Sequence, residues 1–330
     1  MLITLDIVIS LFLLAIPFFC FYMQNKNIKT KNQTFWIFIK SNKVYLGIDF
    51  LIGLFFVFTY IAFRYLYHSW GMFSFIHIYM LLLALILPFA LAYLCKNSPK
   101  SAYIVAFVMA FILFLSPMTR PIFLPLERDD MNTIADWDMA IPFNLCNISA
   151  FIYIIAIITK NKYLLGYMIS FGTAGGIINN IQAHNTFRGF WYYTTWESYF
   201  MHILIIVIPI FMLLTNQIKP NLKNASINIA WIFPFFVLAG FVINPLWNTN
   251  FHFTRPNSFT EQFLPTMQSP WIIFDAYVDP FYMVIFISLI FATVSLIYSY
   301  NLLMYKSRVL FYFQPSQTND QIFDTNRPVL

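Results

Sequence analysis

The sequence predicts an all-α polytopic membrane protein with about nine transmembrane helices. The 330-residue chain is 60% hydrophobic and 10% charged, whereas soluble domains are about 25% charged. Apolar runs long enough to cross a bilayer core, which takes about 20 residues in a helix, recur along the whole chain. The basic residues fall mainly in alternate connections, as they do in membrane proteins of fixed orientation.

Each predicted span is an apolar run bounded by polar residues, and two such runs precede a core of seven. The first run lacks the basic start and small-residue cleavage site of a signal peptide. We therefore expect two extra helices with a basic cytoplasmic loop in 1–71, a seven-helix core domain in 72–304, and a partly disordered tail in 305–330. The predicted spans are 2–22, 44–63, 72–94, 101–118, 142–159, 163–183, 199–215, 229–247 and 278–304.

The distribution of lysine and arginine predicts the orientation. Counted over alternate connections, 14 of the 19 basic residues, including every lysine, lie on one side and 5 on the other. The positive-inside rule makes the lysine side cytoplasmic. A nine-helix chain then begins outside and ends inside, and we expect a multi-pass protein of the plasma membrane. The five outer residues are Arg64, Arg120, Arg128, Arg188 and Arg255.

Composition also limits the partners and cofactors. The net charge of +6 is explained by topology, so we expect membrane lipids and not nucleic acid as partners, with protein partners left open. Cys20, Cys95 and Cys146 have no paired spacing, which argues against a disulfide framework or a zinc site. Asp136 and Asp138 have a D-x-D spacing, but a solvated acidic loop over 119–141 is the favoured interpretation. We predict no metal and no cofactor.

Polar residues inside the spans concentrate at the predicted outer ends. Such residues are costly in a bilayer and usually face a partner or a cavity. Transporters tend to place them near the midplane, whereas here Cys146 and His202 each lie about one turn from an outer helix end. Both are candidates for a reactive role. Residues predicted to bind substrate at the same depth are His77, Asn144, Asn147, Asn179, Gln182, Asn244 and Asn248.

A cysteine and a histidine in one polar pocket favour nucleophilic chemistry. The thiolate is the reactive form, and a nearby imidazolium or a helix N-terminus, here expected at Pro142, stabilises it. Asparagine side chains can donate to an oxyanion. Each residue also has a structural interpretation, because a lone cysteine in a membrane helix is commonly a packing residue and asparagines commonly join helices. The small-residue run 172–176 (GTAGG) predicts close helix packing and no chemistry.

Five short motifs, in order along the chain, carry a resemblance to a known family. They are 75–77 (FIH), 141–149 (IPFNLCNIS), 171–176 (FGTAGG), 199–202 (YFMH) and 244–251 (NPLWNTNF). Together they resemble the YwaF-type bacterial integral membrane family, which is related to the eukaryotic transmembrane protein 164. The resemblance covers about 72–304, which leaves the first two helices as an addition to the family core.

The resemblance implies a phospholipid-remodelling acyltransferase that works through a cysteine acyl-enzyme. The cysteine carried over is Cys146, and its histidine partner is His202. The chain departs from the family pattern at Asn144, where many members have a histidine. An amide is no base, so either His202 or His77 has that role or the chemistry is absent.

The favoured function is therefore a membrane acyltransferase with a Cys146 thioester, His202 as base and a pocket open to the outer face. The alternative is a non-enzymatic transporter or lipid-handling permease with an outward-facing polar pocket. A structural subunit of a larger complex is a third interpretation.

Overall fold

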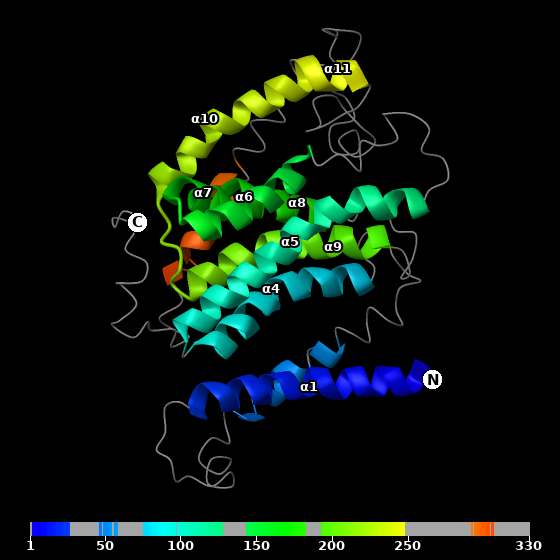
Figure 1. The fold of residues 1–330 in the computed structure, drawn as a ribbon. Helices are drawn as coiled ribbons and strands as arrows, with labels where there is room; N and C mark the ends of the chain where they lie inside the picture. The colour runs from blue at the N-terminus through cyan, green and yellow to red at the C-terminus, as the bar shows by residue number, and fades with distance from the viewer. Residues whose placement is uncertain are drawn as a thin grey trace.

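The computed structural model is built from α-helices and contains no β-strand among the residues that it describes, which confirms the all-α class. Rod-like helices lie side by side, with α1 at one edge of the bundle and α10 at the other (Figure 1). The structure describes residues 2–26, 46–47, 49–54, 56–58, 75–96, 98–127, 143–182, 193–247, 292, 294–303 and 305–306.

The N-terminal helix α1 (Leu2–Lys26) packs closely against the helical residues 49–54. Gly53 makes the approach possible, because a Cβ there would lie 2.8 Å from the Leu14 carbonyl oxygen. Asp49 is fully buried. Burial lowers the pKa of Lys96, at the end of α4, and the Asp49 charge opposes this shift. An electrostatic contact therefore connects the N-terminal helices to the rest of the bundle.

Helices α4 (Phe75–Cys95) and α5 (Pro99–Glu127) form an antiparallel pair joined by a tight turn, in which the Ser98 N–H donates to the Cys95 carbonyl at 3.0 Å. The predicted span 101–118, followed by a loop from 119, is wrong at its end, because α5 continues to Glu127. It contains three internal prolines, which membrane helices tolerate better than soluble ones. The rest of the predicted loop, with Asp136 and Asp138, lies outside the described residues.

Helix α6 (Leu145–Thr159) reverses into α7 (Lys162–Tyr167) through Lys160, whose φ of 53° is left-handed. The Asn161 side chain caps α7 by accepting from the Tyr163 N–H at 2.9 Å. The chain continues through one π-helical turn, η3 (Met168–Gly172), into α8 (Thr173–Gln182). This continuous helix matches the predicted span 163–183.

Side chains from other elements satisfy the carbonyls of the η3 turn. The Met168 carbonyl accepts from Thr173 Oγ1 at 2.7 Å and from the Tyr153 hydroxyl at 3.3 Å. The Ile169 carbonyl accepts from Asn301 Nδ2 at 2.7 Å. Because a π turn alters the backbone hydrogen-bond pattern and lipid offers no replacement partner, these side-chain hydrogen bonds stabilise the irregular turn.

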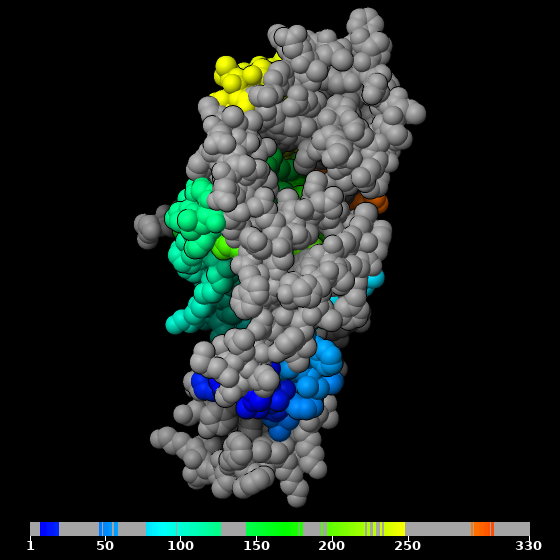
Figure 2. All heavy atoms as spheres, turned by 90° about the vertical axis from the view of Figure 1, so that its right-hand side faces the viewer, coloured from blue at the N-terminus to red at the C-terminus, as the bar shows by residue number. Residues whose placement is uncertain are grey.

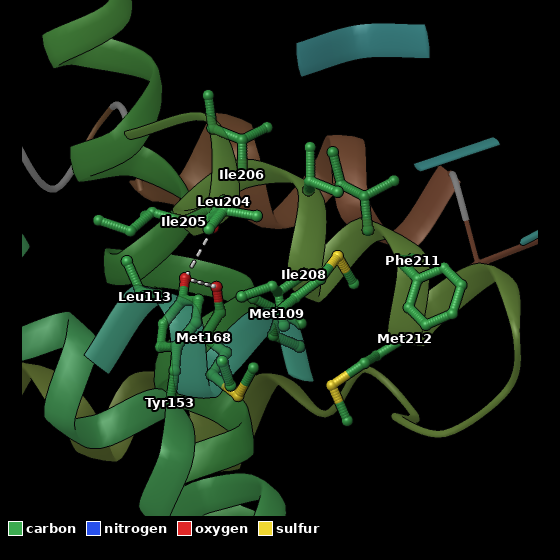
Figure 3. Packing of buried hydrophobic residues seen from close by; sticks show 14 of the residues in the cluster. Met109, Leu113, Tyr153, Met168, Leu204, Ile205, Ile206, Ile208, Phe211 and Met212 are labelled. Atoms are coloured by element: carbon green, nitrogen blue, oxygen red, sulfur yellow. Dashed lines mark hydrogen bonds between the residues drawn. The ribbon is translucent and has the colours of Figure 1, made fainter. Parts of the chain in front are cut away.

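Helix α9 (Tyr193–Leu214) is the central helix and packs against α4, α5, α6 and α8. Every side chain from 203 to 214 is buried. Figure 3 shows the Tyr153 hydroxyl of α6 directed at the α9 backbone, where it donates to the Ile205 carbonyl at 2.9 Å. Both the apolar packing and this buried hydrogen bond hold α6 against α9.

A long helix at the edge of the bundle consists of α10 (Leu222–Leu238), η4 (Ala239–Ile243) and α11 (Asn244–Trp247). It packs against α7, and Asn228 Nδ2 donates to the Tyr163 carbonyl at 3.2 Å. The last predicted span, 278–304, is helical at its described residues 292 and 294–303. The predicted connections 23–43 and 248–277, and the tail beyond 306, lie outside the described residues except at 23–26.

Three helices in the described part of the chain are long and apolar enough to cross a membrane: His77–Cys95, Pro99–Leu126 and Glu197–Leu214. The lipid-facing surface is visible on α5, where Ile104, Val108, Phe111, Ile112 and Leu115 are exposed at helical spacing. Exposed apolar stripes of this kind are typical of helices in lipid. The count of nine spans and their orientation stay predictions.

Interhelical contacts bring the start of α4, the end of α5, the start of α6, the end of α8 and the start of α9 to one end of the bundle. Figure 2 views the molecule from the side on which the N-terminus and α11 lie, with α1 in blue below and α10 and α11 in yellow at the top. We call the end where these helix termini meet the polar end. The turns α4–α5 and α6–α7 lie at the opposite end, with Lys96 and Lys160.

The glycine pair in α8 provides a test of the packing against α9. A Cβ on Gly176 would lie 2.8 Å from Ile205 Cγ2 and 3.1 Å from the His202 carbonyl oxygen, whereas one on Gly175 would meet nothing within 4 Å. We expect Gly176→Ala to lower the free energy of unfolding by about 1–3 kcal/mol through overpacking, measured as the thermal midpoint in detergent. Gly175→Ala is the control and keeps or raises the midpoint, because alanine favours helix. Equal midpoints would contradict the close approach.

Candidate active site

Cys146 lies in the first turn of α6. The helix begins at Leu145 with Asn144 as its N-cap residue, whose side chain makes no capping hydrogen bond. The expected helix start at Pro142 is therefore placed too early, because Asn144 has extended backbone angles (φ −67°, ψ 151°). The Cys146 side chain is partly buried and packs against the apolar core. The thiol thus lies near the N–H groups that an α-helix leaves without intrahelical partners.

Asn179, near the end of α8, is the described partner of the Cys146 thiol. Its Nδ2 lies 2.9 Å from Cys146 Sγ and donates to it, and the same amide nitrogen donates to the Gly175 carbonyl at 3.1 Å. Cys146 and Asn179, two predicted site residues that are 33 positions apart in sequence, are thus in direct contact. The hydrogen bond fixes the direction in which the sulfur points.

His202 lies on α9 and makes its hydrogen bond within that helix. Its Nδ1 is 2.6 Å from the Ser198 carbonyl oxygen, and because a carbonyl only accepts, Nδ1 carries the proton. A neutral His202 then has its lone pair on Nε2, the form in which an imidazole acts as a base. Among the described residues no hydrogen bond joins His202 to Cys146, so the predicted catalytic pair stays a prediction.

His77 has a different position from His202. It is 1% exposed in the first turn of α4, and its Nε2 donates to the Asn180 carbonyl at 2.6 Å. Asn180 in turn donates from Nδ2 to the Gly176 carbonyl at 3.0 Å. This chain of contacts ties α4 to α8 at the polar end, which gives His77 a structural role beside any catalytic one.

The remaining predicted site residues are spread around this contact. Asn147 follows Cys146 and is buried, and its Oδ1 has no hydrogen-bond partner among the described residues. Asn144 is half-buried, and Asn244 is fully buried at the start of α11. The backbone of Gln182 ends α8, while its side chain and all of Asn248 lie outside the described part of the chain.

Sequence reasoning missed a buried ion pair at the polar end. Arg120 of α5 donates from Nε, at 3.0 Å, and from Nη2 to the same carboxylate oxygen of Glu197 on α9. Ser116 Oγ donates to the other carboxylate oxygen. The predicted loop 119–141 contains Arg120, whereas the structure places this residue in α5. The apolar residues that follow it, 121–126 (PIFLPL), were the signal that the helix continues.

A second set of contacts joins α5 to α9 at Tyr193, one turn before Glu197 on α9. The Thr119 hydroxyl and the Tyr193 hydroxyl are hydrogen-bonded, and the Tyr193 ring stacks on Phe123 with the ring centroids 4.4 Å apart. The polar end of α5 is therefore fixed to α9 by polar and aromatic contacts together. Within the described residues no group of three or more His, Cys, Asp or Glu side chains is arranged to hold a metal ion.

The fold and its surface define a polytopic helical membrane protein with a polar cluster at one end of its helix bundle. The chain belongs to the TMEM164 family, whose model matches residues 72–298. The resemblance to transmembrane protein 164 is thereby confirmed, and the match begins where the two N-terminal helices were expected to end. No curated protein and no solved structure matches the chain.

The Asn179 contact predicts the reactivity of the thiol. Because a hydrogen bond to sulfur stabilises the thiolate, we expect Asn179→Leu to slow alkylation of Cys146 by N-ethylmaleimide. A bond of about 1 kcal/mol corresponds to a roughly fivefold slower rate, measured by mass spectrometry of the peptide that contains residue 146. Asn144→Leu is the comparison variant, because Asn144 is the neighbouring N-cap residue and its side chain makes no capping hydrogen bond. An unchanged rate in Asn179→Leu would show that the contact does not influence the thiol.

Proposed function

We propose that the protein is a membrane acyltransferase that remodels phospholipids through an acyl thioester on Cys146. The observation that carries the proposal is the Asn179 amide directed at Cys146 Sγ in the first turn of a helix. A thiol held among hydrogen-bond donors is suited to nucleophilic attack. The polar end would face the outside of the plasma membrane, as the distribution of lysines predicts.

The reaction would proceed in two acyl transfers. Cys146 Sγ attacks the carbonyl carbon of a phospholipid ester as His202 Nε2 takes the thiol proton. The ester C–O bond breaks, and the departing lysophospholipid oxygen receives that proton. A hydroxyl of a second lipid then attacks the thioester carbonyl and gives its proton to His202. The C–S bond breaks, the new ester forms, and His202 returns the proton to the departing sulfur. The products are one lysophospholipid and one newly acylated lipid, with every proton accounted for.

The arrangement of His202 supports its role as the base. Its Nδ1–H is engaged with the Ser198 carbonyl, which leaves Nε2 to accept a proton. Catalytic hydrogen bonds are often long or absent before substrate binds. A bridging water or the lipid hydroxyl would therefore complete the path between His202 and Cys146.

Amides near the sulfur would stabilise the tetrahedral intermediate. Candidate donors to the oxyanion are the Asn179 side chain and the N–H groups in the first turn of α6. Asn147 Oδ1, buried beside Cys146 and without a described partner, would accept from a lipid hydroxyl. Acyl chains can enter between helices from the bilayer while the head group stays at the membrane surface, which suits a site at the end of the bundle.

A transporter or lipid-handling permease is the second candidate. The observation in its favour is that buried polar contacts at the polar end, such as His77 with Asn180, do not involve a thiol. A solute site of this kind predicts that Cys146→Ala keeps activity while His202→Ala or Asn248→Ala loses it. The enzyme instead requires the sulfur.

The acyl-enzyme is the direct test. We expect purified protein incubated with acyl-labelled phospholipid to form a hydroxylamine-sensitive adduct, and Cys146→Ser to form no thioester. Cys95→Ser is the matched control, since Cys95 is buried in the core at the opposite end of α4 and is expected to keep the adduct. If wild-type protein forms no adduct and membrane lipid composition is the same with and without Cys146, the enzymatic proposal fails.

A further inference from the structure

The Arg120–Glu197 ion pair lies within the part of the bundle that is apolar enough to span a membrane. Both residues belong to candidate membrane spans, and their side chains are 11% and 2% exposed. Ionisable residues in such segments are expensive and usually mark a functional site. A contact that only joined α5 to α9 would not need charges, because apolar side chains of similar volume often stabilise a protein as well as a buried ion pair does.

The pair is rigidly held. Two donors of Arg120 converge on one carboxylate oxygen of Glu197, and Ser116 binds the other. Arg120 is on α5 and Glu197 on α9, and α6, which carries Cys146, packs against both helices. Neither charge can therefore move far from α6 without loss of these hydrogen bonds.

Both charges lie on helices that contact the helix of the candidate nucleophile. α6 packs against α5 and α9, and Cys146, Arg120 and Glu197 all lie at the polar end, where the low dielectric of a protein interior strengthens electrostatic effects. The guanidinium favours a thiolate, whereas the carboxylate disfavours it. Among the described residues, the buried Tyr153 on the same helix and Tyr167 on α7 also interact electrostatically with Cys146.

We propose that Arg120 and Glu197 are positioning residues that set the reactivity of Cys146 by opposing electrostatic effects. The inference rests on the proposed function of Cys146 and adds its regulation. A cation near the nucleophile favours its ionised form. Glu197 opposes this effect and keeps Arg120 in place through their hydrogen bonds.

The test is the pH profile of Cys146 alkylation, measured by mass spectrometry with the neutral reagent N-ethylmaleimide on full-length protein in detergent. Glu197→Gln leaves the Arg120 charge unopposed, and we expect the alkylation midpoint to move to lower pH. Arg120→Gln leaves the Glu197 charge unopposed, and we expect the midpoint to move to higher pH. Arg120→Gln/Glu197→Gln removes both charges and is expected to lie between the two single variants.

Opposite shifts separate an electrostatic role from a structural one, because loosened packing would change accessibility in the same direction in both single variants. Ser116→Ala, which removes a hydrogen bond to Glu197 and no charge, is the matched control and is expected to keep the wild-type midpoint. Glu197→Gln is nearly isosteric, so it decides the question alone if Arg120→Gln does not fold. An unchanged or higher midpoint in Glu197→Gln overturns the inference.

The proposed function and this inference fail separately. If the variants shift the alkylation profile in opposite directions but wild-type protein forms no acyl adduct, the charges tune a thiol that is not an acyl carrier. If the adduct forms and the profiles coincide, Cys146 is the nucleophile and the ion pair only joins α5 to α9.

Discussion

Backbone carbonyls inside this bundle accept hydrogen bonds from side chains of neighbouring helices, and the arrangement of the helices depends on these bonds. In a bilayer no water replaces a missing partner, so irregular backbone must be satisfied within the protein. Tyr153 binds the Ile205 carbonyl of α9, and Asn301 binds the Ile169 carbonyl in η3. Apolar side chains fill the volume between helices, but lipid is equally apolar. The directional bonds therefore determine which faces of the helices meet.

The same constraint shapes the polar end. His77 is held by the Asn180 carbonyl and Arg120 by Glu197, which leaves the polar groups of this end arranged around α8 and α9. Asn179 directs Cys146 Sγ, and the N–H groups at the start of α6, which have no intrahelical carbonyl partner, lie beside it. A nucleophile needs its hydrogen-bond donors in place before substrate arrives. Among the described residues, helix packing holds the Asn179 donor against the sulfur of the proposed nucleophile.

The sequence pattern predicted how far along each helix a polar residue lies. It did not predict which neighbouring helix that residue faces. The small-residue spacing of Gly172 and Gly176 predicted close packing, which the contacts with Tyr153 and Ile205 confirm. Depth also placed Cys146 and Asn179 at a common level. The pattern could not show that Asn179, and not Asn180, faces α6. Neighbouring residues of a helix point about 100° apart, so the packing of α8 determines which of the two contacts α6. The predicted loop 119–141 includes Arg120, whereas α5 continues through the apolar residues that follow it to Glu127.

The contact between Cys146 and Asn179 is the central geometric claim, and cross-linking tests it most directly. In a background without Cys20 and Cys95, the cysteine introduced by Asn179→Cys should form an oxidant-induced intramolecular disulfide with Cys146, detected by mass spectrometry of the joined peptides. The matched control Asn180→Cys should not cross-link, since the Asn180 amide donates to the Gly176 carbonyl instead. A disulfide with the control and none at position 179 would show that α8 is rotated away from the arrangement described, and that Asn179 does not hold the thiol.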